Sequence, residues 1–218
     1  MSPSLFITLE GTEGGGKSTQ IQRLAERLRA TGREVIALRE PGGTPAGEVI
    51  RHLLKHSEAN RALTPEAELL LMCASRAQLV REIIRPMLAA GQVVLCDRFF
   101  DSTTAYQGYG RQLDLARVRA VIDFAIGPTR PDLTLFLHVP VAVSEARRQT
   151  RADSQPQPRD RFEEADRAFF QRVEEGFQAI ARAEPHRFKV VDATGSIETV
   201  EAALWRLVEP LIEARRKG

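Results

Sequence analysis

The stretch LFITLE-GTEGGGKST, residues 5–19, decides the fold of this chain. Its first six residues are an apolar run typical of a buried strand, and a glycine loop leads from them into an amphipathic segment typical of a helix. The loop has the spacing G-x-x-x-x-G-K-S of a phosphate-binding loop. Glycines allow successive backbone N–H groups and the helix N-terminus to face an anion. The sequence therefore predicts a nucleotide-binding protein.

The polar residues of this loop have distinct predicted roles. Lys17 is expected to reach the terminal phosphates of the nucleotide, and the Ser18 hydroxyl is expected to bind Mg²⁺. The backbone around the phosphates is predicted to come from the whole loop: Gly11, Thr12, Glu13, Gly14, Gly15, Gly16, Lys17, Ser18 and Thr19.

The composition, 43% hydrophobic and 28% charged, is ordinary for a folded soluble protein. The 218 residues carry a net charge of +2, so no polyanionic partner is indicated, and they suit a single domain. Cys73 and Cys96 lie in apolar segments and are expected to be buried, reduced thiols of a cytoplasmic protein. Residues 1–4 show no signal peptide, and no apolar run approaches the ~18 residues that a membrane span needs.

Four further short apolar runs, at residues 34–38, 92–96, 133–139 and 188–191, predict strands. Each is followed by a helix-forming stretch, and this alternation favours a parallel sheet with helices on both faces. One long helix is expected from Thr64-Pro65 toward Gly91, with a kink near Pro86. Trp205 falls on or beside the apolar stripe of the last helix and is expected in the core.

Ligands of such sheets bind beyond the carboxyl ends of the strands, so the residues that follow each run are the candidates for the site. Arg39 and Glu40 follow the second strand. Asp97 follows the third, where a carboxylate can complete a Mg²⁺ site opposite Ser18, and the adjacent Arg98 can bridge the phosphates of two substrates. Hydroxyls, an amide and aromatic rings suited to a nucleobase and sugar come next, at residues 102–109, STTAYQGY.

A basic segment with closely spaced prolines interrupts the helical pattern. Residues 147–161 read RRQTRADSQPQPRDR, and a continuous helix cannot pass through both prolines. We interpret residues 148–160, approximately, as a short mobile lid that closes arginines over the phosphates; a solvated loop is the alternative.

Taken together, these residues resemble the bacterial thymidylate kinases over nearly the whole chain. Beyond the glycine loop, the matching motifs are REPGGT at residues 39–44, ASR at 74–76, DR at 97–98, STTAYQ at 102–107, RPD at 130–132 and DRFE at 160–163. The glycine loop occurs in many ATPases, whereas the ordered set is specific to this family.

The resemblance implies a P-loop kinase fold with a five-stranded parallel sheet, and transfer of the γ-phosphoryl group of ATP to dTMP with Mg²⁺. It also implies a homodimer packed through helices, near the apolar residues 69–71, and a candidate cis bond between Glu40 and Pro41. The residues it places around dTMP are Glu13 at the 3′-hydroxyl, Arg39 and Arg98 at the phosphate, Arg76 and Gln107 at the thymine with Thr103 nearby, and Tyr106 against the deoxyribose. Ser102 is also expected to bind the substrate. Met72 occupies the position where the family commonly stacks an aromatic ring on thymine.

Gly14 stands where some relatives carry a basic residue in the loop, so this chain resembles the class that supplies its catalytic arginine from the lid. The matching position is Arg151, with Arg147 as a supporting contact and Arg159 as the alternative. Asp192 is expected near the adenine of ATP.

Two other readings stay open from the sequence. Another P-loop kinase, acting on a different nucleotide or on a small acid, would share the phosphate machinery. A GTP-binding switch is suggested by D-x-x-G at residues 192–195, but this motif follows the last strand, and the base-reading N-K-x-D is absent from the sequence.

Overall fold

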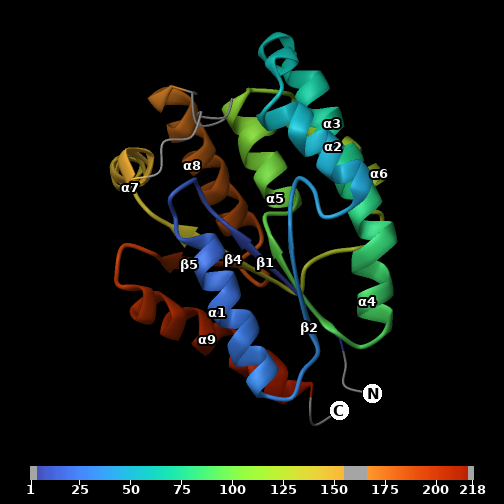
Figure 1. Ribbon diagram of the computed structural model, residues 1–218, viewed down its shortest axis with the longest axis vertical. Helices are drawn as coiled ribbons and strands as arrows, with labels where there is room; N and C mark the ends of the chain where they lie inside the picture. Colours follow the sequence, from blue (N-terminus) through green and yellow to red (C-terminus); the bar gives the residue numbers. More distant parts are fainter. Residues whose placement is uncertain (1–3, 155–165, 216–218) are drawn as a thin grey trace.

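The computed structural model describes residues 4–154 and 166–215, and a parallel five-stranded sheet organises them (Figure 1). The spatial order of the strands is β2-β3-β1-β4-β5. The predicted α/β fold is confirmed, and the strand bounds differ from the predicted ones by at most one residue at either end. The strands are β1 (Leu5–Glu10), β2 (Val35–Arg39), β3 (Val93–Asp97), β4 (Leu133–His138) and β5 (Phe188–Asp192).

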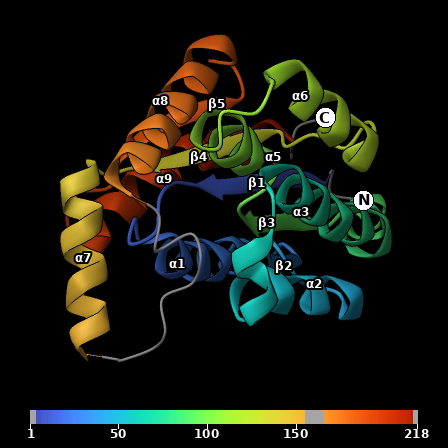
Figure 2. The same ribbon diagram turned by 90° about the horizontal axis from the view of Figure 1, so that it is seen from above.

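Helices cover both faces of the sheet (Figure 2). Leu5, Ile7 and Leu9 of β1 pack on the face covered by α1 (Lys17–Ala30) and α9 (Ile197–Ala214). Phe6 of the same strand packs among side chains of α3 (Pro65–Leu79) and α6 (Leu115–Ile126) on the other face. This alternation makes β1 apolar on both faces. The helices are α1 (Lys17–Ala30), α2 (Pro45–Lys55), α3 (Pro65–Leu79), α4 (Arg85–Ala89), α5 (Phe100–Thr103), α6 (Leu115–Ile126), α7 (Val141–Ser154), α8 (Arg167–Ala183) and α9 (Ile197–Ala214), with further helical turns at Glu58–Ala62, Val80–Ile84 and Thr104–Gly110.

The helix predicted from Thr64 to Gly91 begins as expected but is interrupted earlier than Pro86. The Thr64 hydroxyl accepts a hydrogen bond from the backbone N–H of Ala67 at 3.2 Å, which caps α3. A π-helical turn at Val80–Ile84 then separates α3 from α4, and the N–H of Arg85 donates to the carbonyl of Val80. Pro86 has no N–H to donate to the preceding turn, so the helical hydrogen bonds are rearranged on its N-terminal side.

The C-terminal part of the core matches the prediction. Trp205 is 8% exposed and packs on the α1 side of the sheet, with the Arg27 guanidinium 4.3 Å from its ring centroid. Cys73 and Cys96 are buried free thiols. In the described part of the chain, no helix is both long and apolar enough to cross a membrane.

Candidate active site

The glycine loop between β1 and α1 has the backbone that a phosphate-binding loop requires. Gly14 and Gly16 adopt φ values of +80° and +85°, a region that side chains with Cβ atoms rarely occupy. Gly11 has φ +140°, and a Cβ at this position would lie 2.6 Å from the carbonyl oxygen of Leu137 on β4. The loop therefore needs glycine at Gly11 both for its conformation and for its close approach to the neighbouring strand.

Lys17 is folded back onto this loop. Its ammonium donates to the carbonyls of Thr12 at 2.9 Å and Gly11 at 3.1 Å, and the residue is 6% exposed. Burial lowers the pKa of Lys17, and the nearby positive charge of Arg98 lowers it further. Two backbone carbonyls therefore hold the amine beside the loop, and no carboxylate of the described residues forms a salt bridge with it.

Ser18 and Asp97 lie opposite each other, as predicted for a metal site. The Ser18 hydroxyl donates to Asp97 Oδ2 at 3.2 Å. Among the described residues, Asp97 Oδ1 is a buried oxygen with no hydrogen-bond partner. A hydroxyl and an oxygen of this kind are the ligands that Mg²⁺ takes from protein in phosphate-transfer sites, so the pair fits this ion.

Arg98 is the centre of a charged cluster at the end of β3. Its guanidinium contacts Glu13 Oε1 at 2.9 Å, the Ser102 hydroxyl at 3.0 Å and the Tyr106 hydroxyl at 3.3 Å. Burial alone would lower the pKa of Arg98, but Tyr106 and Glu13 raise it well above its usual value. Burial would likewise raise the pKa of Glu13, but Arg98 and Lys17 hold it well below its usual range. Both groups are therefore charged at neutral pH.

Glu10 is a buried carboxyl group with no role predicted from the sequence, and it holds the turn that carries Arg98. Glu10, the last residue of β1, is fully buried and accepts hydrogen bonds from the backbone N–H of Phe99 at 2.7 Å and from the Ser102 hydroxyl. Burial raises the pKa of Glu10 to about 8, and the neighbouring Asp101 adds to the increase. These bonds fix the turn in which Arg98 adopts φ +69°.

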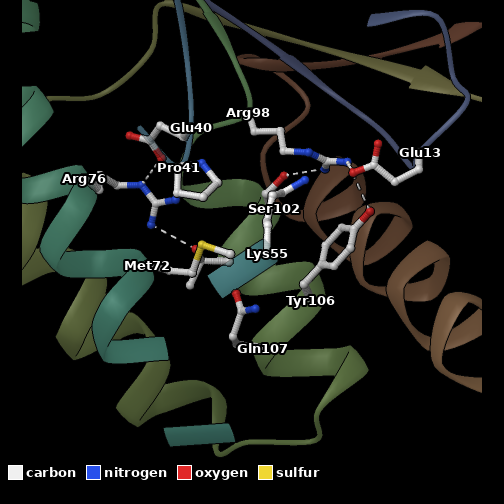
Figure 3. A pocket seen from close by; sticks show the side chains of 11 residues that line it. Glu13, Glu40, Pro41, Lys55, Met72, Arg76, Arg98, Ser102, Tyr106 and Gln107 are labelled. Carbon is white, nitrogen blue, oxygen red and sulfur yellow. Dashed lines mark hydrogen bonds and ion pairs between the residues drawn. The ribbon is translucent and has the colours of Figure 1, made fainter. Parts of the chain in front are cut away.

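Arg76 forms one wall of a small cavity beside Arg98 (Figure 3). It is 2% exposed and donates to Glu40 at 2.6 Å, to the Thr103 hydroxyl at 2.9 Å and to the carbonyl of Phe99 at 3.1 Å. Burial raises the pKa of Glu40 to about 7 although Arg76 opposes the shift. The predicted cis bond between Glu40 and Pro41 is confirmed.

The remaining predicted base-pocket residues also line this cavity. Met72 and Gln107 lie below Arg76 in Figure 3, and Gln107 donates to the buried Glu68 at 2.8 Å. Tyr106 lines the cavity as well, whereas Tyr109 faces α8, where a Cβ added to Gly176 would touch its ring. Only one of the two tyrosines therefore belongs to the site.

A second cavity adjoins the first and extends over the glycine loop. Arg39 lies at its rim and pairs with Glu48 at 2.9 Å. Arg147 of α7 donates to the carbonyls of Ala193 at 3.0 Å and Thr194 at 3.3 Å, so it joins α7 to the segment that directly follows Asp192, the last residue of β5. The lining consists of Glu13, Gly14, Gly16, Lys17, Ser18, Thr19, Arg39, Glu40, Arg51, Lys55, Asp97, Arg98 and Arg147.

The structure thus brings together the residues predicted from three strand ends. Lys55 and Arg51, both on α2, line the phosphate cavity and were not predicted, because they belong to no recognisable motif. Residues 148–154 of the predicted lid continue α7. The side chain of Arg151 and the whole of Arg159 lie outside the described residues.

A parallel sheet with a phosphate-binding loop and an adjoining cavity lined by polar and aromatic side chains is the arrangement of a P-loop nucleotide kinase. The model of the thymidylate kinase family matches residues 9–204. A thymidylate kinase of Pseudomonas fluorescens is 51% identical over 97% of this chain and 98% of its own length, and one of a Synechococcus strain is 49% identical over 98% of both chains. The crystal structure of thymidylate kinase from Ehrlichia chaffeensis superposes with a TM-score of 0.76 at 33% identity, covering 94% of this chain and 99% of that one.

The chain belongs to the thymidylate kinase family. Its predicted family and enzyme class are confirmed, and the reading as a GTP-binding switch is not supported.

Proposed function

We propose that the chain transfers the γ-phosphoryl group of ATP to the phosphate of dTMP, giving ADP and dTDP. The observation that carries this function is the pair of adjoining cavities, one over the glycine loop and one lined by Arg76 and Gln107. They share Glu13, Glu40, Lys55 and Arg98. A nucleoside monophosphate with its base in the second cavity would place its phosphate at this shared wall, facing the nucleoside triphosphate.

The base cavity supplies groups that suit thymine and deoxyribose. Gln107 is held by Glu68 and Arg76 by Glu40, so their remaining hydrogen-bonding capacity has a fixed direction. Met72 offers a thioether that can pack on the face of a base. Tyr106, fixed by its contacts with Arg98, would lie against the sugar, and Glu13 would accept the 3′-hydroxyl.

Catalysis in this arrangement rests on positioning and charge. An oxygen of the dTMP phosphate attacks the γ-phosphorus while the bond to ADP breaks, and negative charge accumulates between the two substrates. Lys17 would hold the terminal phosphates of ATP, and Arg98, with Arg39 at the rim, would hold the acceptor phosphate. Ser18 and Asp97 would hold Mg²⁺, which neutralises charge on the phosphate oxygens when bound.

We also propose that the lid supplies a catalytic arginine, Arg151 or, alternatively, Arg159. Support comes from Arg147, four residues before Arg151 on α7, which already lines the phosphate cavity. In a helix, residues four apart lie on the same face. The chain is proposed to be one domain with this lid inserted.

We also propose that the chain forms a homodimer and acts in the cytoplasm. Large apolar side chains are exposed on three helices, Val49 on α2 (72%), Leu70 on α3 (58%) and Phe124 on α6 (87%), and α3 packs against both of the others. Exposed apolar surface of this kind favours association. The free thiols of Cys73 and Cys96 are consistent with a reducing compartment.

The activity is tested by following both products after mixing the protein with ATP, Mg²⁺ and dTMP. We expect ADP and dTDP in equal amounts, and neither product with Lys17→Met. Formation of ADP without dTDP would show an ATPase and would contradict the proposed transfer.

A further inference from the structure

We infer that Lys55 is a ligand of the acceptor phosphate, in addition to Arg98. The inference rests on the proposed function, because it assumes that a nucleoside monophosphate occupies the base cavity.

Lys55 stands where the two cavities meet. It is the last residue of α2 and is partly buried, and Figure 3 shows its side chain extending toward Ser102 and Arg98. Within the described residues, Lys55 and Arg98 are the only cations that line both cavities. The nearby arginines differ in this respect, since Arg39 and Arg51 line the phosphate cavity but not the base cavity.

The charges at this junction favour an anion beside Lys55. Glu13 and Glu40 also line both cavities, and their carboxylates are close to Arg98 and Arg76, respectively. The positive charge of Lys55 contributes, after those of Arg98 and Lys17, to lowering the pKa of Glu13, which shows that the ammonium lies within electrostatic range of that carboxylate. A phosphate monoester brings close to two negative charges at neutral pH. Arg98 is already paired with Glu13 and Arg39 with Glu48, so these two arginines would balance only part of that charge.

The side-chain chemistry of lysine suits this position. A flexible stem ending in a compact ammonium with three donors can follow the phosphate as the substrates approach each other, whereas the guanidinium of Arg98 is fixed by Glu13, Ser102 and Tyr106. Lys55 would therefore adapt to the acceptor phosphate while Arg98 orients it.

Binding of dTMP and thymidine, measured by calorimetry, separates phosphate recognition from recognition of the base and sugar. For Lys55→Met we expect the Kd of dTMP to rise by about tenfold or more, as for loss of a hydrogen bond to a charged group. The Kd of thymidine, which lacks the phosphate, should stay within about twofold. Lys55→Arg should recover part of the affinity for dTMP. Lys189→Met, on the edge strand β5, is the matched control and should change neither constant.

Equal weakening of dTMP and thymidine by Lys55→Met would overturn the inference, since it would indicate a structural role. Unchanged binding of both would also overturn it. Failure of the wild-type protein to bind dTMP at all would contradict the proposed function itself.

Discussion

Glu40 and Arg76 form a salt bridge of 2.6 Å in which the side chains are only 3% and 2% exposed. The pair joins the residue after β2 to α3, and both side chains line the base cavity. Removing two charges from water is costly, and the cost is offset here by further hydrogen bonds from Arg76 to Thr103 and Phe99. Burial also raises the pKa of Glu40 to about 7, so the stability of the protein depends on pH.

Glu40→Gln should remove part of the pH dependence of stability. In the folded protein the pKa of Glu40 is about 7, above its ordinary value of 4.5, so between these pH values the folded state binds more protons than the unfolded state. Stability from this group is therefore present at low pH and is lost as pH rises to about 7. We expect the free energy of unfolding of the wild type, relative to Glu40→Gln, to fall by on the order of 3 kcal/mol from pH ~5 to pH ~7, then level off.

Urea unfolding of both proteins at several pH values measures this difference. A difference between the two proteins that does not change with pH would contradict the assignment of the raised pKa to Glu40.

Gly11→Ala should destabilise the protein far more than Gly32→Ala. Both glycines have positive φ, but a Cβ at Gly11 would meet a backbone oxygen at 2.6 Å, whereas one at Gly32 would have no atom within 4 Å. We expect Gly32→Ala to cost about 1 kcal/mol, from backbone strain alone, and Gly11→Ala to cost about 3 kcal/mol or more. Thermal unfolding of the two variants compares them directly, and similar losses would show that the approach of Gly11 to Leu137 is not tight.

Asp97→Asn tests the predicted metal pair. An amide has no negative charge to attract Mg²⁺, so the Mg²⁺ concentration needed for half-maximal activity should rise by about tenfold or more. Asp123→Asn, on the surface of α6, serves as the control and should leave the requirement unchanged. An unaltered Mg²⁺ requirement in Asp97→Asn would remove this residue from the metal site.

Substitution of each lid arginine in turn tests which of them is catalytic. By analogy with arginine fingers, Arg151→Ala should lower kcat by roughly 10³–10⁵-fold, because charge developing between the substrates would lose a stabilising partner. Arg159→Ala should have a much smaller effect. Steady-state rates of both variants decide the matter: if Arg151→Ala keeps most of its kcat while Arg159→Ala loses it, the catalytic role belongs to Arg159.

The sequence alone predicted the sheet, the glycine loop and the polar residues at the strand ends, because each rests on short-range patterns. Arg76 shows the limit of such patterns. By its residue type it would be placed on the surface, and only the resemblance to a family placed it in the site. Its burial depends on Glu40, which is 36 residues away in the chain.

Glu10 and Lys55 were not assigned for a related reason. Glu10 looks like the polar end of a strand, and its role becomes visible only when the turn at Phe99 and Ser102 folds over it. Lys55 ends a helix in an otherwise ordinary position, and its function depends on where α2 packs. Tertiary packing, rather than local sequence, determines both.

The acceptor specificity tests the central claim most directly. ADP release is measured with ATP and Mg²⁺ while dTMP, dUMP, dGMP, dCMP, AMP and UMP are offered separately. The account predicts strong turnover with dTMP, weaker turnover with dUMP and little with the others, since Arg76, Gln107 and Tyr106 line the cavity and are proposed to contact thymine and deoxyribose. If dTMP were inert and another acceptor turned over, the assignment of the base cavity would be wrong although the phosphate loop would retain its role.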